Sequence, residues 1–307
     1  MAEDTAGSPV DEKLLWTNRS PRDIAEEVAV AGYEVSPDTV RKILTEDLEL
    51  HLRQAEKDEP AGAYPEREEQ FEHLSRLRAH YVREGWPVVS VDTKHKELLG
   101  NFYRGGAAYT SGHVHVWDHD FATFGDGRLV PYGVYDLAAN EGFVLLSRGA
   151  DTSEMACDAT ERWWRTLGQQ HWWHAPKLLV LCDCGGANGY RHWRFKEDLK
   201  QLAIRLGLTI QVAHYPPYCS KYNPIEHRLF CHLSRSLRGV VLKTMSVARR
   251  FLERTTTATG LQVLIETTRK LYRKGRQASR GFLETTPVTF ARVLPELNYS
   301  LTPQPMP

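Results

Sequence analysis

The sequence lacks several features that mark common classes of protein. No apolar run approaches the ~20 residues that a membrane-spanning helix requires, and the acidic, polar start does not resemble a secretory signal peptide. The five cysteines are odd in number and include no Cys-x-x-Cys pair, which argues against a disulfide framework and a zinc ribbon. A Gly-x-Ser-x-Gly nucleophile motif and a phosphate-binding loop are also absent from the sequence. We therefore expect a cytoplasmic protein with free thiols.

The composition is that of an ordinary globular protein, and the charge is unevenly spread. The chain of 307 residues is 41% hydrophobic and 25% charged, and its length suits one large domain and a small module at roughly 100–200 residues a domain. Its formal net charge is zero, yet thirteen Lys or Arg residues and only two acids occur from Arg228 to Arg280. This basic region can hold a polyanion or can simply form solvated helical faces.

Residues 1–55 are predicted to contain a partial helix-turn-helix segment. Ser20 and Ser36 each place a capping hydroxyl before a proline suited to a first helical turn, and Gly32 falls between the two expected helices. The pattern is typical of a DNA-binding motif, although short helix pairs also serve as packing units. The side chains predicted to contact DNA are Arg19, Arg22, Thr39, Arg41 and Lys42.

The rest of the chain is predicted to be a linker at residues 56–67, an α/β domain with basic C-terminal helices at residues 68–300, and a tail at residues 301–307. Apolar, β-branched runs predict strands at residues 88–92, 132–137, 142–146, 177–182 and 209–214. Helices are expected at residues 152–167, at residues 190–206 and from about Asn223. This element order is that of the RNase H-like fold, a mixed five-stranded sheet flanked by helices.

Three carboxylates stand in separate contexts that suit a metal site. Asp92 and Asp183 each end an apolar strand, and Glu226 follows a Pro-rich turn into a helical pattern. In the RNase H-like order the two strands can lie side by side, so their carboxylates would be neighbours. Carboxylate oxygens suit Mg²⁺ or Mn²⁺, and two such ions can clamp the oxygens of a phosphoryl transfer. A strand-ending Asp can also be a structural hydrogen-bond acceptor.

Other side chains offer alternatives to this metal site. A second candidate centre comprises His113, His115, Asp118, His119 and Asp120, and a zinc site could form from Cys219, His227 and Cys231. Asp136 lies within the expected hairpin and is interpreted as structural. Several tryptophans either pack in the core or stack on unpaired bases: Trp163, Trp164, Trp172, Trp173 and Trp193.

Four longer motifs resemble one family of proteins. The strings VSVDTKHKELLGNFYRGG, VPYGVYDLAANEGFV, DCGGANGYR and SKYNPIEHRLF resemble the Rhodopirellula-type DDE transposases of bacterial insertion sequences. The string PPYCSKYNPIEH is similar to the wider mariner-related group, in which Asn-Pro-Ile-Glu carries the last catalytic acid. The likeness runs from about Trp16 to about Gly260. It implies an RNase H-like core in which the catalytic, metal-binding triad is Asp92, Asp183 and Glu226.

The resemblance also implies a substrate and an activity. The protein would use Mg²⁺, or Mn²⁺ in its place, to hydrolyse double-stranded DNA at transposon ends and to join the freed 3′ hydroxyl to target DNA. A homodimer would bring two ends together at the bacterial nucleoid. Residues that flank the last acid would orient it or contact DNA: Lys221, Asn223, His227 and Arg228. Because the likeness starts only at about Trp16, a truncated, inactive remnant or repressor is the alternative, and an RNase H-like repair nuclease is a third.

Overall fold

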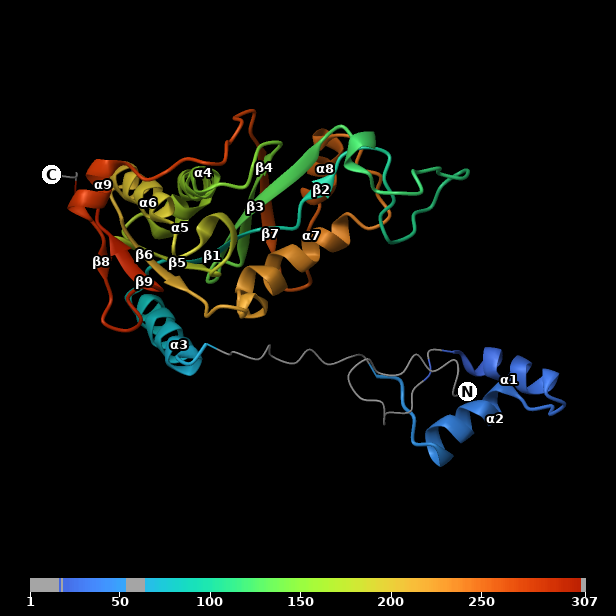
Figure 1. Cartoon of the computed structure of the whole chain (residues 1–307). Helices are drawn as coiled ribbons and strands as arrows, with labels where there is room; N and C mark the ends of the chain where they lie inside the picture. Colours follow the sequence, from blue (N-terminus) through green and yellow to red (C-terminus); the bar gives the residue numbers. More distant parts are fainter. Residues whose placement is uncertain (1–16, 18, 54–63, 305–307) are drawn as a thin grey trace. The chain divides into compact units, whose positions relative to one another are not determined.

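The computed structural model describes residues 17, 19–53 and 64–304, which belong to two compact units, Met1–Gly62 and Ala63–Pro307 (Figure 1). The first unit contains α1 (Pro21–Val30) and α2 (Pro37–Lys42), which continues into the π-helical turn η1 (Ile43–Asp47). Ser20 and Ser36 cap the two helices as their patterns predicted, each accepting a hydrogen bond from a backbone N–H three residues on. Buried Ile24, Ala25 and Val40 form the small core between the helices.

The second unit is an α/β domain. Its strands are β1 (Val88–Thr93), β2 (Glu97–Leu98), β3 (Arg128–Asp136), β4 (Glu141–Ser147), β5 (Lys177–Cys182), β6 (Thr209–His214), β7 (Gln262–Thr267), β8 (Thr289–Phe290) and β9 (Asn298–Leu301). Its α-helices are α3 (Arg67–Glu84), α4 (Ser153–Trp163), α5 (Gln169–Trp172), α6 (Trp193–Leu206), α7 (Cys231–Ser236), α8 (Met245–Leu252) and α9 (Arg280–Thr285). Short 3₁₀ or π turns are η2 (Ala122–Phe124), η3 (Trp164–Gly168), η4 (Gly186–Asn188), η5 (Ser220–Tyr222) and η6 (Glu226–Phe230).

The strands form one mixed sheet in the order β7-β4-β3-β1-β5-β6-β9-β8, with β2 on β3. Strand β1 is antiparallel to β3 and parallel to β5, while β4 is antiparallel to β3 and β6 is parallel to β5. The five strands β4-β3-β1-β5-β6 therefore confirm the predicted RNase H-like fold. The sheet is wider than the five strands predicted, because β7 extends the β4 edge and β9 and β8 extend the β6 edge.

Two of these additional strands lie where other structure was expected. Strand β7 occupies part of the segment for which basic C-terminal helices were predicted, and β9 runs to Leu301, one residue into the predicted tail. Leu301 is fully buried opposite Ile210 of β6. Most of the predicted linker, residues 56–63, lies outside the described residues, and so do residues 305–307 of the predicted tail. No helix in the described part of the chain has both the length and the apolar character needed to cross a membrane.

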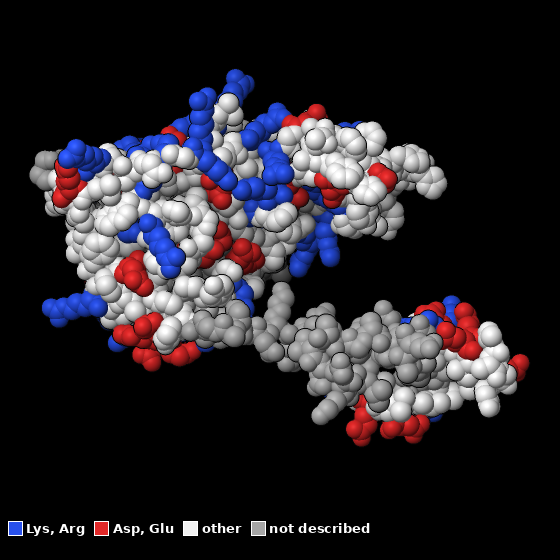
Figure 2. All heavy atoms as spheres, viewed as in Figure 1, with Lys and Arg blue, Asp and Glu red and all other residues white. Residues whose placement is uncertain are grey.

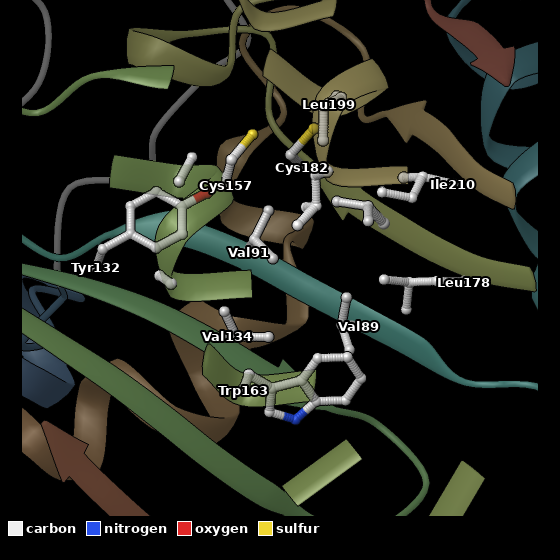
Figure 3. Close-up of a cluster of buried hydrophobic side chains, with 14 of the residues drawn as sticks. Val89, Val91, Tyr132, Val134, Cys157, Trp163, Leu178, Cys182, Leu199 and Ile210 are labelled. Carbon is white, nitrogen blue, oxygen red and sulfur yellow. The ribbon is translucent and has the colours of Figure 1, made fainter. Parts of the chain in front are cut away.

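Alternation along the strands divides the core between the two faces of the sheet. Val89 and Val91 of β1 face α4 and α6, where they join a cluster that includes Trp163 and Leu199 (Figure 3). The opposite face of the sheet carries two further clusters, one around α3 and one around η6, α7 and α8. The even-numbered residues of β1 are therefore turned toward the segment that contains Glu226.

Candidate active site

Asp92 and Asp183 are brought together by the register of two parallel strands. Ser90 of β1 pairs with Leu181 of β5, so two residues further on, at the carboxyl ends of the strands, Asp92 comes opposite Asp183. Both acids are an even number of residues from this pair, and they therefore share one face of the sheet. The apolar runs that make β1 and β5 central strands thus determine where the two carboxylates lie.

Glu226 reaches the same edge of the sheet from the layer that covers this face. It is the first residue of η6, which packs on β3 through the buried side chains of Leu229 and Phe230. The preceding loop is tied to β1: the Ser90 hydroxyl donates to Asn223 Oδ1 and accepts from the Ile225 backbone N–H at 3.0 Å. These bonds attach the Asn-Pro-Ile-Glu segment to the strand that ends in Asp92.

Mutual repulsion and burial perturb all three acids. Burial raises the pKa of Asp92 well above its usual range, and the negative charges of Asp183 and Glu226 raise it further. Burial likewise raises the pKa of Asp183, against the opposing effect of a hydrogen bond from the Gly185 N–H. The pKa of Glu226 is raised by burial and by Asp183, although nearby His227 and Lys94 counteract both. The three carboxyl groups therefore share one electrostatic environment.

Backbone amides hold one oxygen of each aspartate. The Thr93 N–H donates to Asp92 Oδ1 at 2.7 Å, and the Gly185 N–H donates to Asp183 Oδ1 at 3.2 Å. Behind Asp183, His214 Nδ1 donates to the Asp183 carbonyl oxygen at 2.8 Å, while the Tyr299 hydroxyl lies 3.3 Å from His214 Nε2. Each carboxylate is thereby oriented, and its second oxygen is left for another ligand.

A fourth acid, Asp151, was missed by the sequence reasoning. It follows β4, and its Oδ1 accepts a hydrogen bond from the Thr93 hydroxyl at 2.9 Å. Its charge contributes to the raised pKa values of Asp92 and Asp183. With those two acids it lines a cavity of about 540 Å³ at the edge of the sheet, which Asp120 also reaches. Nothing in the spacing of Asp151 from the predicted acids indicated this proximity.

The cavity also contains a buried lysine. Lys94 is 5% exposed, and its Nζ lies 2.7 Å from Glu97 Oε1. The Glu97 carboxylate is shared with Arg104, at 3.2 Å from Nε, and these two cations keep the pKa of Glu97 below its usual range despite burial. This ion-paired group fixes a positive charge beside Glu226.

The chemistry of the acids fits a hard divalent cation, since close carboxylates with raised pKa values are stabilised by an added positive charge. Among the described residues, no three His, Cys, Asp or Glu side chains converge closely enough to enclose a metal ion. Mg²⁺ commonly binds through one or two carboxylates and keeps water or substrate oxygens as its other ligands. Asp92 and Asp183 suit such an open site, with Glu226 at its margin.

The two alternative metal centres are not formed within the described part of the chain. The His113 to Asp120 segment is an exposed loop, and only Asp120 of its proposed ligands lines the cavity that Asp92 and Asp183 line. Cys219 is buried, whereas Cys231 is exposed and donates to the His227 carbonyl oxygen at 2.9 Å. Asp136 is structural as predicted: its carboxylate accepts from two backbone amides and from Trp172 Nε1.

The residues that flank Glu226 separate into two groups. Lys221, His227 and Arg228 are exposed, with His227 bonded to the Lys221 carbonyl oxygen and Arg228 beside the Tyr135 hydroxyl. Asn223 is fully buried, and its Nδ2 lies 3.4 Å from the Val91 carbonyl oxygen. The prediction that the Asn223 side chain contacts DNA is therefore wrong for this structure. The other predicted role, orienting Glu226, is compatible with its burial.

In the helix pair, four of the five residues predicted to contact DNA are exposed: Arg22, Thr39, Arg41 and Lys42. Arg19 is half-buried and pairs with Glu27 at 2.6 Å, and Arg41 pairs with Asp38 at 3.0 Å. Residues 17–53 contain five Lys or Arg and eight Asp or Glu. A nucleic-acid contact by this unit would consequently depend on a few side chains rather than on a broadly basic face.

Comparison with known proteins identifies the family directly. The family described as "Rhodopirellula transposase DDE domain" matches residues 1–303, a longer match than the span from Trp16 to Gly260 that the motifs indicated. No curated protein matches the chain significantly.

Similar solved structures are those of a mariner-type enzyme. The Mos1 transposase paired-end complex with left transposon end is 15% identical with a TM-score of 0.46, and a pre-cleavage Mos1 transpososome is 14% identical with a TM-score of 0.47. Each match covers 76% of this chain and 66% of the Mos1 chain, so the match spans just under two thirds of the Mos1 length. These likenesses are distant, and the assignment rests on the family match. This chain belongs to the Rhodopirellula transposase DDE domain family.

Proposed function

We propose that the protein is an active DNA transposase that cuts a phosphodiester at a transposon end and joins the freed 3′ hydroxyl to target DNA. The observation that carries the proposal is that Asp92 and Asp183 line one cavity at the edge of the sheet, with Glu226 close enough for its charge to raise the pKa of Asp92. Membership of a transposase family supplies the substrate class.

In this proposal Asp92 and Asp183 hold Mg²⁺ or Mn²⁺, and Glu226 completes the site. Bound there, the cations would stabilise charge on the attacking and leaving oxygens of an in-line displacement. The protein's own part is positional: the Thr93 and Gly185 amides orient the two aspartates, and Asn223 holds the segment of Glu226. Lys94 keeps a positive charge beside the acids, where a phosphate can approach.

The DNA contacts and the assembly are further parts of the proposal. Arg22, Thr39, Arg41 and Lys42 are exposed on the helix pair and would bind the transposon end, with Arg19 positioned by Glu27. Lys221, His227 and Arg228 would contact DNA beside the catalytic edge. Synapsis of two ends would require a homodimer, measurable by light scattering in the presence of end DNA. A location at the bacterial nucleoid follows from such a substrate.

The decisive experiment incubates the purified full chain with DNA that flanks its own reading frame, in Mg²⁺ or Mn²⁺. We expect strand cleavage followed by joining to a target plasmid. Asp183→Asn should reduce cleavage by about 10²–10³-fold, on the order of the effect of removing a main electrostatic contributor to catalysis, while DNA binding persists. Asp118→Asn is the matched control, because the Asp118 side chain is 86% exposed on a surface loop.

Each of the other outcomes would support a different function or refute the assigned residues. Tight binding of end DNA without cleavage by the wild type would indicate a remnant or a repressor of transposition. Hydrolysis without joining would indicate an RNase H-like nuclease. Cleavage that is unchanged in Asp183→Asn would refute the assignment of the catalytic acids.

A further inference from the structure

A second cavity adjoins the catalytic cavity. Its volume is about 760 Å³, and the two cavities share Lys96, Asp151, Gly186 and Ala187 in their walls. Gly186 follows Asp183 by three residues, and Asp151 contributes to the raised pKa of Asp183. An extended ligand with one atom group at the catalytic acids can therefore continue into the second cavity without leaving the protein surface.

One wall of this second cavity is the start of α6. His192, Trp193 and Arg194 all line it, and they include the N-cap and first two residues of a 14-residue helix. His192 provides no side-chain cap, so the first N–H groups and the positive end of the helix dipole are directed at this end of the cavity. Trp193 is 37% exposed there.

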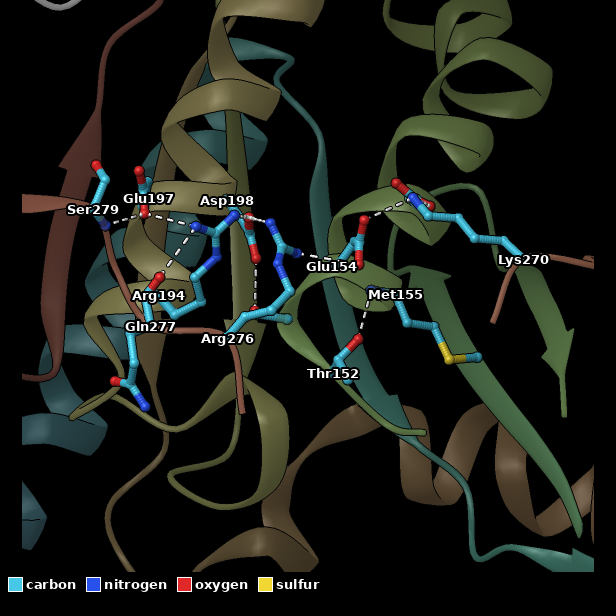
Figure 4. Close-up of polar contacts among 12 residues, drawn as sticks. Thr152, Glu154, Met155, Arg194, Glu197, Asp198, Lys270, Arg276, Gln277 and Ser279 are labelled. Carbon is cyan, nitrogen blue, oxygen red and sulfur yellow. Dashed lines mark hydrogen bonds and ion pairs between the residues drawn. The ribbon is translucent and has the colours of Figure 1, made fainter. Parts of the chain in front are cut away.

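Another wall is residues 273–278, which belong to the irregular segment 268–279 between β7 and α9. Several ion pairs and hydrogen bonds anchor it to α4 and α6 (Figure 4). Lys270 Nζ lies 2.9 Å from Glu154 and 2.7 Å from Asp158, Arg276 Nη1 lies 3.1 Å from Glu154, and the Ser279 N–H donates to Glu197 at 2.9 Å. The segment is thus held in place although it has no regular secondary structure.

The charges of this cavity are mostly uncompensated. Arg194 and Arg276 are paired with acidic residues, but Lys96, Arg191, Arg273 and Lys274 form no ion pair with any described residue. Arg273 and Lys274 lie on the anchored segment between its fixed points. In Figure 2, Lys and Arg side chains gather along the upper side of the second unit, where this segment runs in Figure 1.

We infer that this second cavity binds one unpaired DNA strand, the continuation of the strand whose phosphate lies at the catalytic acids. The four unpaired cations would contact successive phosphates, because a backbone with one charge per nucleotide matches a row of separated cations. The Trp193 ring is partly exposed, with Lys196 Nζ over one face at 5.5 Å from the ring centre. Stacking on its other face favours a single strand over a duplex, since only an unpaired base offers a free face. This inference rests on the proposed transposase function and specifies the form of its substrate.

The test measures binding of fluorescein-labelled oligo-dT and of a blunt duplex to the full chain by anisotropy, in a metal chelator and at several NaCl concentrations. We expect Arg273→Gln/Lys274→Gln to weaken oligo-dT binding at least tenfold. The slope of log K against log salt should fall by about 1.4, since each phosphate contact on a single strand contributes about 0.7. The matched control is Arg76→Gln/Arg83→Gln on α3, which lines neither cavity and should leave both quantities unchanged.

Trp193 provides a second, charge-neutral variant. Trp193→Ala should weaken oligo-dT binding without changing the salt slope, and Trp193→Phe should restore much of the affinity because it retains an aromatic face. Equal losses in the α3 control, or a loss confined to the blunt duplex, would overturn the inference.

Failure of this inference is distinguishable from failure of the proposed function. If Arg273→Gln/Lys274→Gln binds and cleaves as the wild type does while Asp183→Asn is inactive, the transposase stands and the strand site is refuted. If the wild type cleaves nothing, oligo-dT binding still reports on the second cavity by itself.

Discussion

Ser90 and Asn223 are hydrogen-bonded to each other inside the protein, 133 positions apart in the sequence. Both residues are fully buried. Ser90 lies two residues before Asp92, and Asn223 lies three residues before Glu226. The contact therefore ties the strand of one proposed catalytic acid to the turn of another, which lies in the layer packed on that face of the sheet.

Asn223→Ala is expected to lower catalysis more than its effect on folding explains. The change leaves the buried Ser90 hydroxyl without its acceptor, which costs about 1–3 kcal/mol of stability. It also frees the segment that positions Glu226. We predict that urea unfolding will show this decrease in the free energy of unfolding. The cleavage rate should fall at least tenfold at temperatures where the variant is fully folded. Ser220→Ala, at an exposed position of the same loop, should change neither, and a folded Asn223→Ala with full activity would contradict the positioning role.

A substitution at Gly133 gives a second test of how η6 packs on β3. A Cβ at this position of β3 would lie 2.5 Å from Phe230 and 2.8 Å from Ile225, so Gly133→Ala must displace the turn that starts at Glu226. Overpacking of this kind costs about 1–3 kcal/mol, and we expect cleavage to fall with it. Gly112→Ala is the matched control, because a Cβ there meets nothing within 4 Å. A thermal unfolding midpoint that is the same for both variants would show that η6 is not packed on β3 as described.

A strand could be predicted from the sequence where its own residues carry the pattern that forms it. Strands β1 and β5 are mainly apolar runs, β6 alternates apolar and polar residues, and the β3–β4 hairpin carries its own turn residues. The central sheet, and the positions of Asp92 and Asp183 at the ends of their strands, could therefore be predicted from the sequence. Strands β7 and β9 were not predicted. Strand β7 is as long as β1, but it is mostly unburied and lies within a basic segment that indicated helices, and β9 has only four residues. Each is stabilised by pairing with a distant strand. Leu301 was assigned to a tail for this reason.

The candidate site also combines residues that a local pattern predicts with residues that only distant contacts bring in. Asp92 and Asp183 each end an apolar run and Glu226 follows a Pro-rich turn, whereas Asp151 reaches the cavity only because the loop after β4 returns past Thr93. Asn223 lies in a Pro-rich turn, a pattern that suggests an exposed loop. It is buried because it bonds to Ser90 in the middle of β1. Contacts between segments far apart in the chain set both outcomes, and no spacing within either segment encodes them.

His214 should make the wild type sensitive to acid. Burial lowers its pKa to about 4, below the value of about 6.5 for an unfolded histidine. A depressed pKa of a base means that the neutral ring stabilises the fold above pH 6.5, and that this contribution is lost as the pH falls toward 4. Between pH 6.5 and 5 the loss is roughly 2 kcal/mol. His214→Gln should therefore lose less stability over that interval in urea unfolding than the wild type does; parallel losses would show that His214 is not buried as a neutral ring.

Divalent cations should stabilise the folded chain through Asp92 and Asp183. A ligand that binds only the folded state at 100 times its Kd adds about 2.7 kcal/mol, and here it also relieves the repulsion that raises the pKa of Asp92. We predict that Mn²⁺ raises the thermal unfolding midpoint in a concentration-dependent way and that the increase is abolished in Asp92→Asn. Because that substitution also removes a buried charge, its own midpoint without metal should be equal to or above that of the wild type. If Mn²⁺ raises the unfolding midpoint of Asp92→Asn by the same amount, the cation binds elsewhere. Asp118→Asn is the control for loss of a surface carboxylate and should respond to Mn²⁺ as the wild type does. Removal of the ion by a chelator should reverse the effect in the wild type, since a metal bound by oriented carboxylates in an open cavity exchanges with solvent.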